Sequence, residues 1–330
     1  MTRKTLVVIG SRTTENKYGV VSGNRLAEAL SRRGWLVTTL HASEGRSLLR
    51  LLLDESPDLI VPVGFGAPCE DGHICAVARL AGIPCAGPTP EAGSIMQDKA
   101  ATSRFVDAVF PPGYGVRSPR GCVLTDDLSS GAAERRVRQL QPALVVKPAY
   151  SGSSDGLSVF ASHEEALVNA TSLLRVEGKL LVQELERSVM SEVSCTVIDR
   201  PDGSLVLPIV ELKRDDVLVL GAKQKFGAEG LNRHIIPTSL PKEITTRLTE
   251  AILTLHDAVG SVGLTRTDAL VLKTGEIVIL ELNGIPGLLE SSIACDAARE
   301  AGISFDDLAV MYAETAYIQR PEPRVWDIAQ

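Results

Sequence analysis

The segment LTRTDALVLKTGEIVILELN, residues 264–283, contains the pattern that decides how this chain is expected to fold. Its two halves, 264–272 and 277–283, are strongly apolar, and the sequence Lys273-Thr274-Gly275 between them is typical of a turn. Two apolar runs joined by a short turn that contains glycine predict a pair of adjacent strands. Their apolar composition indicates that both strands are buried.

Four polar side chains are expected to converge on this strand pair. Side chains alternate along a strand, so Arg266 and Asp268 share one face of the first strand. Glu281 and Asn283 share one face of the second strand. Magnesium prefers a few carboxylate or amide oxygens together with substrate phosphates, and a guanidinium beside it can stabilise charge that develops in a transition state. A solvated hairpin face is the alternative, but it fits poorly here because buried carboxylates need partners or a metal.

The first ninety residues alternate between predicted strands and helices. Strands are expected at 5–9, 36–40 and 59–61, and helices at 22–33, 48–53 and 72–81. This order predicts a doubly wound parallel sheet, in which ligands bind beyond the carboxyl ends of the strands. The loops 10–23 and 64–72 are therefore candidate binding loops.

The middle of the chain contains a lysine followed by a loop rich in glycine and serine. Lys147 ends a predicted strand, and residues 150–156 supply backbone amides and hydroxyls that can hold phosphate. The order differs from that of a P-loop, and a plain hairpin is the alternative. A helix is expected at 94–106, with Asp98-Lys99 in its first turns, where a surface pair is the alternative. Residues 221–239 form a long irregular stretch of the kind used as a lid.

Composition limits the class of protein. The 330 residues carry a net charge of −7, with 44% hydrophobic and 23% charged residues, as in a soluble globular protein of two or three packed units. The acidity argues against nucleic-acid and anionic-membrane partners. The short apolar run at the start predicts no signal peptide and hence a cytoplasmic protein. The six cysteines form no C-x-x-C pair, and no Ser/His/Asp pattern or catalytic His or Cys is visible.

Taken in order, these segments resemble the D-alanine–D-alanine ligases of the ATP-grasp superfamily, from Glu15 to about Leu308. The matching motifs are Glu15 with Ser22-Gly23, Glu70-Asp71-Gly72, Gly82-Ile83-Pro84 with Asp98-Lys99, Lys147-Pro148 with Gly152-Ser153-Ser154, Arg266-Thr267-Asp268, and Glu281-Leu282-Asn283 with Pro286-Gly287 and Ser291-Ser292.

The resemblance implies an α/β protein, α+β in its ATP-grasp part, with a three-domain ATP-grasp fold. Residues 1–93 would form an N-terminal domain with the doubly wound parallel sheet. Residues 94–179 would form a small central ATP-grasp domain. Residues 180–330 would form a C-terminal ATP-grasp domain with the magnesium site. A homodimer is expected.

The resemblance also implies a role for each matched residue. Contacts with ATP are expected from Lys99 and Lys147 at the phosphates, Gly152 and Ser154 in the covering loop, Gln183, Glu184 and Leu185 at the adenine, Glu192 at the ribose, and Lys225 in the lid. Magnesium, or manganese, is expected at Asp268, Glu281 and Asn283. Catalytic roles are expected for Arg266, which would stabilise the tetrahedral intermediate, and for Glu15 and Ser153. The amino-acid sites would be lined by Glu15, Phe226, Gly287, Ser291 and Ser292, with Glu15 at the first ammonium and Ser292 at the second carboxylate.

The implied activity is the ATP-dependent, ADP-forming ligation of two amino acids through an acyl phosphate. Several positions depart from the family. The run VGFGAPC at 63–69 lacks the family's histidine, Ser151 replaces a glutamate, Phe226 replaces the lid tyrosine, and 288–290 replace small residues. These departures favour a ligase with an altered amino-acid pocket, as a role in specialised metabolism would require.

A true D-alanine–D-alanine ligase of cell-wall synthesis is the alternative to that interpretation. Two hypotheses come from other classes: a kinase-like or binding protein of the same fold, and a nucleotide-binding scaffold without turnover. The intact set of magnesium ligands argues against the first. Amino-acid-dependent release of ADP separates the second from an enzyme.

Overall fold

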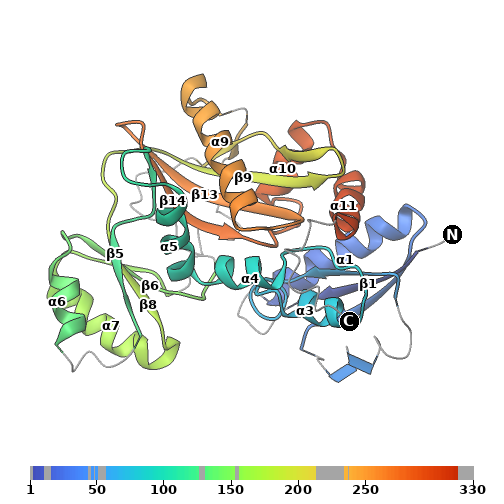
Figure 1. Cartoon of the computed structure of the whole chain (residues 1–330), viewed down its shortest axis with the longest axis horizontal. Coiled ribbons are helices and arrows are strands. Elements are labelled where there is room, and N and C mark those ends of the chain that lie inside the picture. The colour runs from blue at the N-terminus through green and yellow to red at the C-terminus, as the bar shows by residue number, and fades with distance from the viewer. Residues whose placement is uncertain are drawn as a thin grey trace, which may run out of the picture.

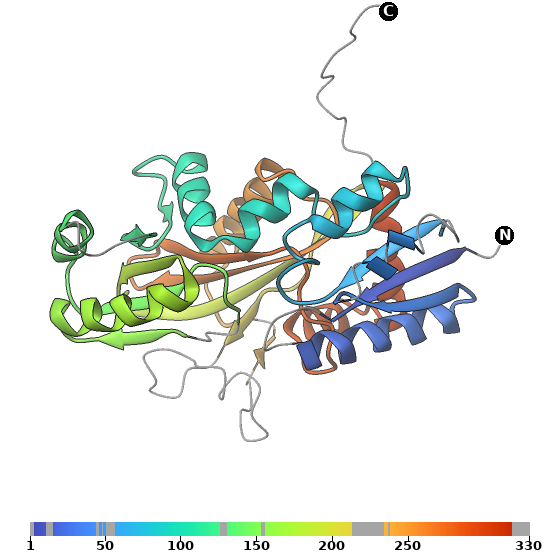
Figure 2. The same cartoon turned by 90° about the horizontal axis from the view of Figure 1, so that it is seen from below.

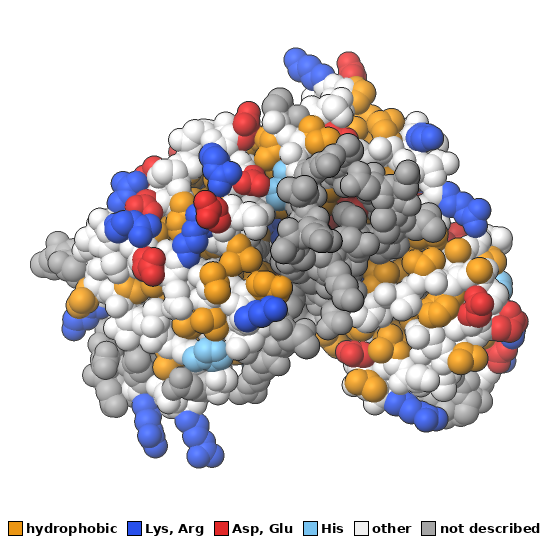
Figure 3. Space-filling model, turned by 180° about the vertical axis from the view of Figure 1, so that it is seen from behind, with side chains coloured by type: hydrophobic (Ala, Val, Ile, Leu, Met, Phe, Trp, Pro, Cys, Tyr) orange, Lys and Arg blue, Asp and Glu red, His pale blue; other side chains and the backbone are white. Residues whose placement is uncertain are grey.

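The computed structural model describes residues 3–10, 16–43, 46–47, 49–50, 57–125, 131–152, 156–212, 234–236 and 238–318. Three sheets follow one another along the molecule, with helices packed against each (Figure 1). Among the described helices, none is long and apolar enough to cross a membrane. On the described part of the face seen in Figure 3, positive and negative side chains are interspersed.

The N-terminal sheet is parallel, as the alternation of strands and helices predicts. Its strands are β1 (Lys4–Ile9), β2 (Leu36–His41) and β3 (Leu59–Val63), in the order β2-β1-β3. The helix α1 (Asn16–Arg32) packs on one face of this sheet and α3 (His73–Leu80) on the other. The two helices are visible below and above the sheet in Figure 2.

The predicted helix at 94–106 is wrong in one respect, because two helices occupy this region. They are α4 (Pro90–Gln97) and α5 (Lys99–Val109). Asp98 between them has extended backbone angles, and its carboxylate accepts hydrogen bonds from the N–H groups of Ala100 and Ala101. Asp98 is thus the N-cap of a new helix, and Lys99 is the first residue of that helix.

The small sheet has the strand order β5-β8-β6-β7 and is antiparallel. Its strands are β5 (Gly121–Leu124), β6 (Leu144–Pro148), β7 (Ser158–Phe160) and β8 (Leu180–Glu184). The helices α6 (Ala132–Arg138) and α7 (His163–Glu177) cover one face with an apolar cluster. The opposite face carries Lys147 and, opposite it in the ladder, Leu181, which packs with Ala100 of α5.

The large sheet contains the strand pair that the sequence predicts. β13 (Leu264–Leu272) and β14 (Ile277–Asn283) are antiparallel neighbours with the predicted bounds. The sheet order is β12-β11-β9-β13-β14-β4, and β10 pairs with β9. The remaining strands are β4 (Val116–Arg117), β9 (Val189–Arg200), β10 (Gly203–Val206), β11 (Val210–Leu212) and β12 (His234–Ile235). α4, α5 and α9 (Lys242–Ala258) pack on one face of it.

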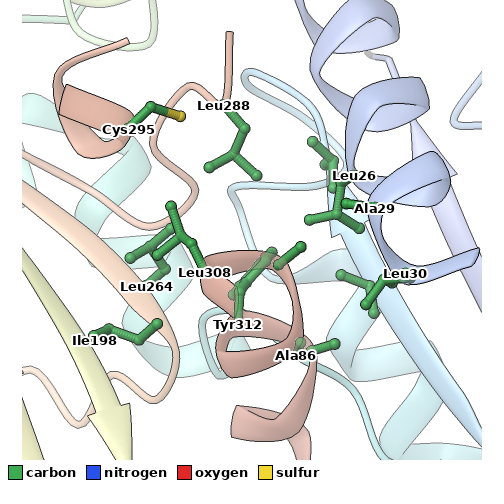
Figure 4. Packing of buried hydrophobic residues seen from close by; sticks show 14 of the residues in the cluster. Leu26, Ala29, Leu30, Ala86, Ile198, Leu264, Leu288, Cys295, Leu308 and Tyr312 are labelled. Carbon is green, nitrogen blue, oxygen red and sulfur yellow. The ribbon is translucent and has the colours of Figure 1, made fainter. Parts of the chain in front are cut away.

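A buried cluster joins the large sheet to the N-terminal sheet. The last helices, α10 (Ile293–Glu300), α11 (Phe305–Glu314) and the 3-10 turn Thr315–Tyr317, lie between them. Leu308 and Tyr312 of α11 pack with Leu30 of α1 and Ile198 of β9 (Figure 4). The hydroxyl of Tyr312 also donates to the carbonyl of Pro62, at 2.9 Å. The two sheets are therefore held in a fixed relation around the C-terminal helices.

Candidate active site

Four polar side chains converge on β13 and β14. Arg266 lies directly opposite Asn283 in the ladder, and Asp268 lies opposite Glu281. Beyond Asp268 the register shifts. Arg266 Nε and Nη2 donate to the two Asp268 oxygens at 2.8 and 2.7 Å, and Arg266 Nη2 lies 3.7 Å from Glu281 Oε1. The predicted juxtaposition of these residues is thus present.

The charge of Arg266 is secured by its surroundings. Burial lowers the pKa of its guanidinium, but the carboxylates of Asp268 and Glu281 outweigh that effect and raise the pKa further above its usual range. The hydroxyl of Ser194 on β9 donates to Asp268 at 2.6 Å and fixes that carboxylate from the other side. Arg266 is therefore a permanent, oriented cation near the amino end of β13.

Lys99 brings a second cation to the same place. Its ammonium lies 3.2 Å from Glu281 Oε2 and donates to the carbonyl of Ser151 at 2.5 Å. Its backbone N–H donates to the carbonyl of Ala149 at 3.0 Å. The first turn of α5, the loop after β6 and the strand β14 thus meet at one side chain. A cavity lies between them, lined by Gly66, Glu70, Met96, Gln97, Lys99, Tyr150, Ser151, Gly152, Glu281, Leu282, Asn283 and Gly284.

The donor atoms here fit a hard divalent cation. Asp268 and Glu281 supply carboxylate oxygens, and Asn283 can supply an amide oxygen. In the described part of the chain no three His, Cys, Asp or Glu side chains form a metal cluster, so the donor set depends on the asparagine. Oxygen-only donors suit magnesium or manganese rather than softer metals.

The residues predicted to contact the adenine and ribose lie on two sheets. Gln183 is 4% exposed and lies opposite Val145 of β6, two residues before Lys147, so that Gln183 and Lys147 share a face of the small sheet. Glu192 is buried on β9, opposite Leu270 of the large sheet. The residues predicted for the adenine and for the ribose thus lie on different sheets.

Glu184 and Leu185 follow Gln183 at the end of β8 and make contacts of their own. The carboxylate of Glu184 accepts the N–H of Gln141 at 2.9 Å and lies 3.5 Å from Arg120 Nε. Leu185 donates its N–H to the carbonyl of Ala143 at 2.9 Å. Together with Gln183, both line a cavity of about 750 Å³ between α5 and the β5–β8 side of the small sheet.

The predicted amino-acid residues near the C-terminus also lie together. Ser292 is the N-cap of α10, and a Cβ atom at Gly287 would be 3.0 Å from its hydroxyl. The same Cβ would be 3.3 Å from the ring of Phe65, in the loop after β3. The sequence pattern indicates no role for Phe65, although the run 63–69 departs from the family. Ser291 is exposed beside Ser292.

The motif Ser22-Gly23 in α1 supports this region. The N–H of Leu288 donates to the Ser22 hydroxyl at 3.4 Å, and Arg25 donates to the Leu288 carbonyl at 2.8 Å. A side chain at Gly23 would collide with Ile9 of β1, which explains the small residue. The first helix therefore fixes the loop that precedes Ser292.

Five predicted site residues lie outside the part of the chain that the structure describes: Glu15, Ser153, Ser154, Lys225 and Phe226. Their roles stay predictions. Ser151 and Gly152, which precede two of them, Ser153 and Ser154, line the cavity beside Lys99.

Known proteins resemble this chain over most of its length. A model of the family described as "D-ala D-ala ligase C-terminus" matches residues 124–312. A D-alanine–D-alanine ligase of Pelotomaculum thermopropionicum is 30% identical over 320 residues, which are 96% of this chain and 97% of that protein. Two crystal structures are similar over 96% of this chain: a D-alanine–D-alanine ligase of Bacillus anthracis complexed with ATP (TM-score 0.76, 20% identity, 98% of that chain) and the VanG D-Ala:D-Ser ligase of Enterococcus faecalis (TM-score 0.77, 21% identity, all of that chain, 100%).

The fold and the matched family define an ATP-grasp ligase, an ATP-binding enzyme of the ADP-forming class. Within that class, the chain belongs to the D-alanine–D-alanine ligase family.

Proposed function

We propose that this enzyme joins two molecules of D-alanine at the expense of ATP. The observation that carries the proposal is the 30% identity with a D-alanine–D-alanine ligase over 96% of one chain and 97% of the other. Such an alignment covers almost the whole of that relative. The similarity therefore supports a true D-alanine–D-alanine ligase, the alternative from the sequence, better than a ligase with an altered amino-acid pocket.

The phosphates are proposed to lie beside Lys99 and Lys147, against the backbone of Gly152. Asp268, Glu281 and Asn283 would hold a divalent cation, which when bound supplies positive charge to the phosphate oxygens. Lys99 already neutralises Glu281 at 3.2 Å, so its ammonium can move from a carboxylate partner to a phosphate partner over a short distance. Gln183, Glu184, Leu185 and Glu192 are proposed for the nucleoside.

Arg266 is proposed to stabilise the negative charge that develops on oxygen in the tetrahedral intermediate. Its guanidinium is held by two hydrogen bonds to Asp268, so its orientation is set before substrates bind. A preorganised cation does not need to reorient when charge develops. Its charge persists at every working pH because an arginine guanidinium loses its proton only far above that range, and the neighbouring carboxylates raise its pKa further.

The second amino acid is proposed to bind at Gly287 and Ser292. The start of α10 favours a carboxylate through its N–H groups and its dipole. Ser292 makes no side-chain capping bond to the helix, which leaves its hydroxyl for a substrate oxygen. Gly287 has no side chain and therefore leaves space beside the Ser292 hydroxyl. Glu15, Ser153, Lys225, Phe226 and Ser291 complete the proposed site, and the predicted domains and homodimer are retained as proposals.

The test is ADP release by the purified enzyme with D-alanine as the sole amino acid, and with L-alanine, D-serine and larger D-amino acids. D-alanine should give the highest kcat/KM, and mass spectrometry should detect D-alanyl-D-alanine. L-alanine is the matched control, because it differs only in configuration. A pair that is at least tenfold better than two D-alanines would contradict the proposal.

A ligase for a different second amino acid is the second candidate. The observation behind it is that the run 63–69, which departs from the family, places the ring of Phe65 at the Cβ position of Gly287, beside Ser292. The same panel of amino acids decides between the two candidates.

A further inference from the structure

Two cysteine thiols outside the ligase site lie in contact. Cys75 Sγ and Cys85 Sγ are 3.0 Å apart, about 1 Å more than the bond length in a disulfide, which is about 2.05 Å. Both thiols also lie within hydrogen-bonding distance of one acceptor, the carbonyl of Ala86, at 3.5 and 3.4 Å. The proposed ligase chemistry uses neither thiol.

The backbone holds both cysteines in place. Cys75 is in the first turn of α3, where the N–H groups on either side of it, those of Ile74 and Ala76, donate to Pro68 and Gly72. Cys85 forms a parallel bridge with Ile60 of β3. On one side of Cys85 the Ile60 N–H donates to the carbonyl of Pro84, and on the other side the Ala86 N–H donates to the carbonyl of Ile60. The two sulfurs are therefore brought together by a helix and a sheet edge, and a bond between them needs little backbone movement.

We propose that Cys75 and Cys85 form a reversible disulfide, which makes this pair a two-electron modification site for low-molecular-weight disulfides. A thiolate of the pair attacks the reagent disulfide and releases one reagent thiolate. The second cysteine then loses its proton and attacks the sulfur of the first, which releases the second reagent thiolate. Two cysteine thiols and one reagent disulfide thus give one protein disulfide and two reagent thiols, and the two protons pass to those thiols.

Exposure and ionisation set the order and the speed of the reaction. Cys85 is partly exposed and Cys75 is 6% exposed, so the reagent should reach Cys85 first. Burial, and then the hydrogen bond and charge of Cys75, raise the pKa of the Cys85 thiol. Because the thiolate is the reactive form, the reaction should be slow at neutral pH and faster as the pH rises.

The bond would tie α3 to the segment that leads into α4. Cross-linking residues 75 and 85 closes a short loop and removes conformational freedom from the unfolded chain. The oxidised protein should therefore resist heat better than the reduced protein. The ligase activity neither requires nor produces this bond, so the inference stands apart from the proposed function.

The experiment incubates the full chain at pH 8.5 with 2-hydroxyethyl disulfide over a range of ratios to 2-mercaptoethanol. Samples are quenched, alkylated in denaturant and mapped by mass spectrometry. We expect a peptide pair joined through Cys75 and Cys85, with Cys122 and Cys295 alkylated as internal controls. The Tm of the oxidised protein should rise by about 3 °C or more over that of the reduced protein.

Two variants sharpen the result. Cys75→Ser should stop at a mixed disulfide on Cys85 and show no rise in Tm, while Cys122→Ser should behave as the wild type. The proposal is overturned if wild-type Cys85 also stops at the mixed disulfide, or if both thiols remain fully alkylated at every ratio. The mapping of the wild type decides the question even where a variant fails to fold.

Discussion

The ammonium nitrogen of Lys99 lies 3.2 Å from Oε2 of Glu281, and this ion pair ties the start of α5 to β14. The two side chains are only 15% and 19% exposed, so water screens their attraction less than at an open surface. Lys99 therefore holds the carboxylate of Glu281 close to Arg266 and Asp268. Before ATP and a metal bring further charges, the negative charges of Asp268 and Glu281 are thus neutralised by the positive charges of Lys99 and Arg266.

Glu281→Gln should lower kcat by about 100-fold or more while the fold remains intact. Glutamine keeps the shape of glutamate but removes the negative charge that a divalent cation and Lys99 both need. The measurement is ADP release as a function of magnesium concentration, with circular dichroism for the fold. Glu276→Gln is the matched control, because Glu276 lies just before β14 and pairs with Arg117 at 3.0 Å instead. Near-normal activity with an unchanged magnesium requirement would remove Glu281 from the metal site.

Arg266→Lys should also lower kcat by about 100-fold, with little change in the KM for ATP. Lysine keeps the charge but cannot form the paired hydrogen bonds that orient Arg266 on Asp268. Steady-state kinetics with saturating D-alanine separate kcat from KM. A loss confined to the KM for ATP would instead make Arg266 a phosphate-binding residue.

Asp199→Asn should destabilise the protein at neutral pH by about 2–4 kcal/mol. Asp199 is buried on β9 and accepts hydrogen bonds from His256 Nε2 at 3.1 Å, Ser204 at 2.6 Å and the Gly263 N–H at 3.0 Å. Burial raises the pKa of this carboxyl, but the hydrogen bonds and the charge of His256 outweigh it, so the pKa lies below its ordinary value.

The sign of the pH effect follows from that shift. The unfolded carboxyl has a pKa of about 3.9, so the stabilisation by Asp199 is complete above that pH and is lost as the pH falls through the lower folded-state value. Urea unfolding between pH 7 and pH 2 should show a shallower acid loss in Asp199→Asn than in the wild type. Asp202→Asn is the control, since Asp202 is 72% exposed. Equal acid slopes in the wild type and Asp199→Asn would contradict this account.

The strand pair could be predicted from the sequence because its determinants are local. The apolar runs 264–272 and 277–283 and the turn between them fix both strands, and alternation places Asp268 and Glu281 without knowledge of the rest of the chain. The match to a known family then supplied roles that alternation alone cannot give.

Other features depend on contacts between distant residues and could not be predicted. The break at Asp98 interrupts a sequence with helical spacing and no proline, and the ion pair between Asp98 and Lys179, far along the chain, accompanies it. The strands β4 and β5 are short and take their place by pairing with β14 and β8. Phe65 meets Gly287 only in the folded chain.

The position of Phe65 leads to a prediction about the size of the second amino acid. Because the Phe65 ring packs at the Cβ position of Gly287, next to Ser292, it should limit the space available to a substrate side chain. Phe65→Ala removes the ring, whereas Phe65→Leu removes only part of it. Phe160→Ala is the matched control, because Phe160 lies at the end of β7 in the small sheet.

We expect Phe65→Ala to raise kcat/KM for D-leucine as second substrate relative to that for D-alanine by about tenfold, with Phe65→Leu in between. One or two methylene groups in an apolar pocket are worth about 1–3 kcal/mol, so a tenfold change, about 1.4 kcal/mol, is within the range that removal of a ring can give. The measurement is ADP release with D-alanine at a fixed level and the second amino acid varied, with the mixed dipeptide quantified by mass spectrometry. Phe160→Ala should leave the ratio at its wild-type value, because its cavity opens away from the site. An unchanged ratio in both Phe65 variants would mean that another side chain bounds the pocket. A fall in activity with every amino acid alike would mean that Phe65 supports the loop around Gly287 and does not limit substrate size.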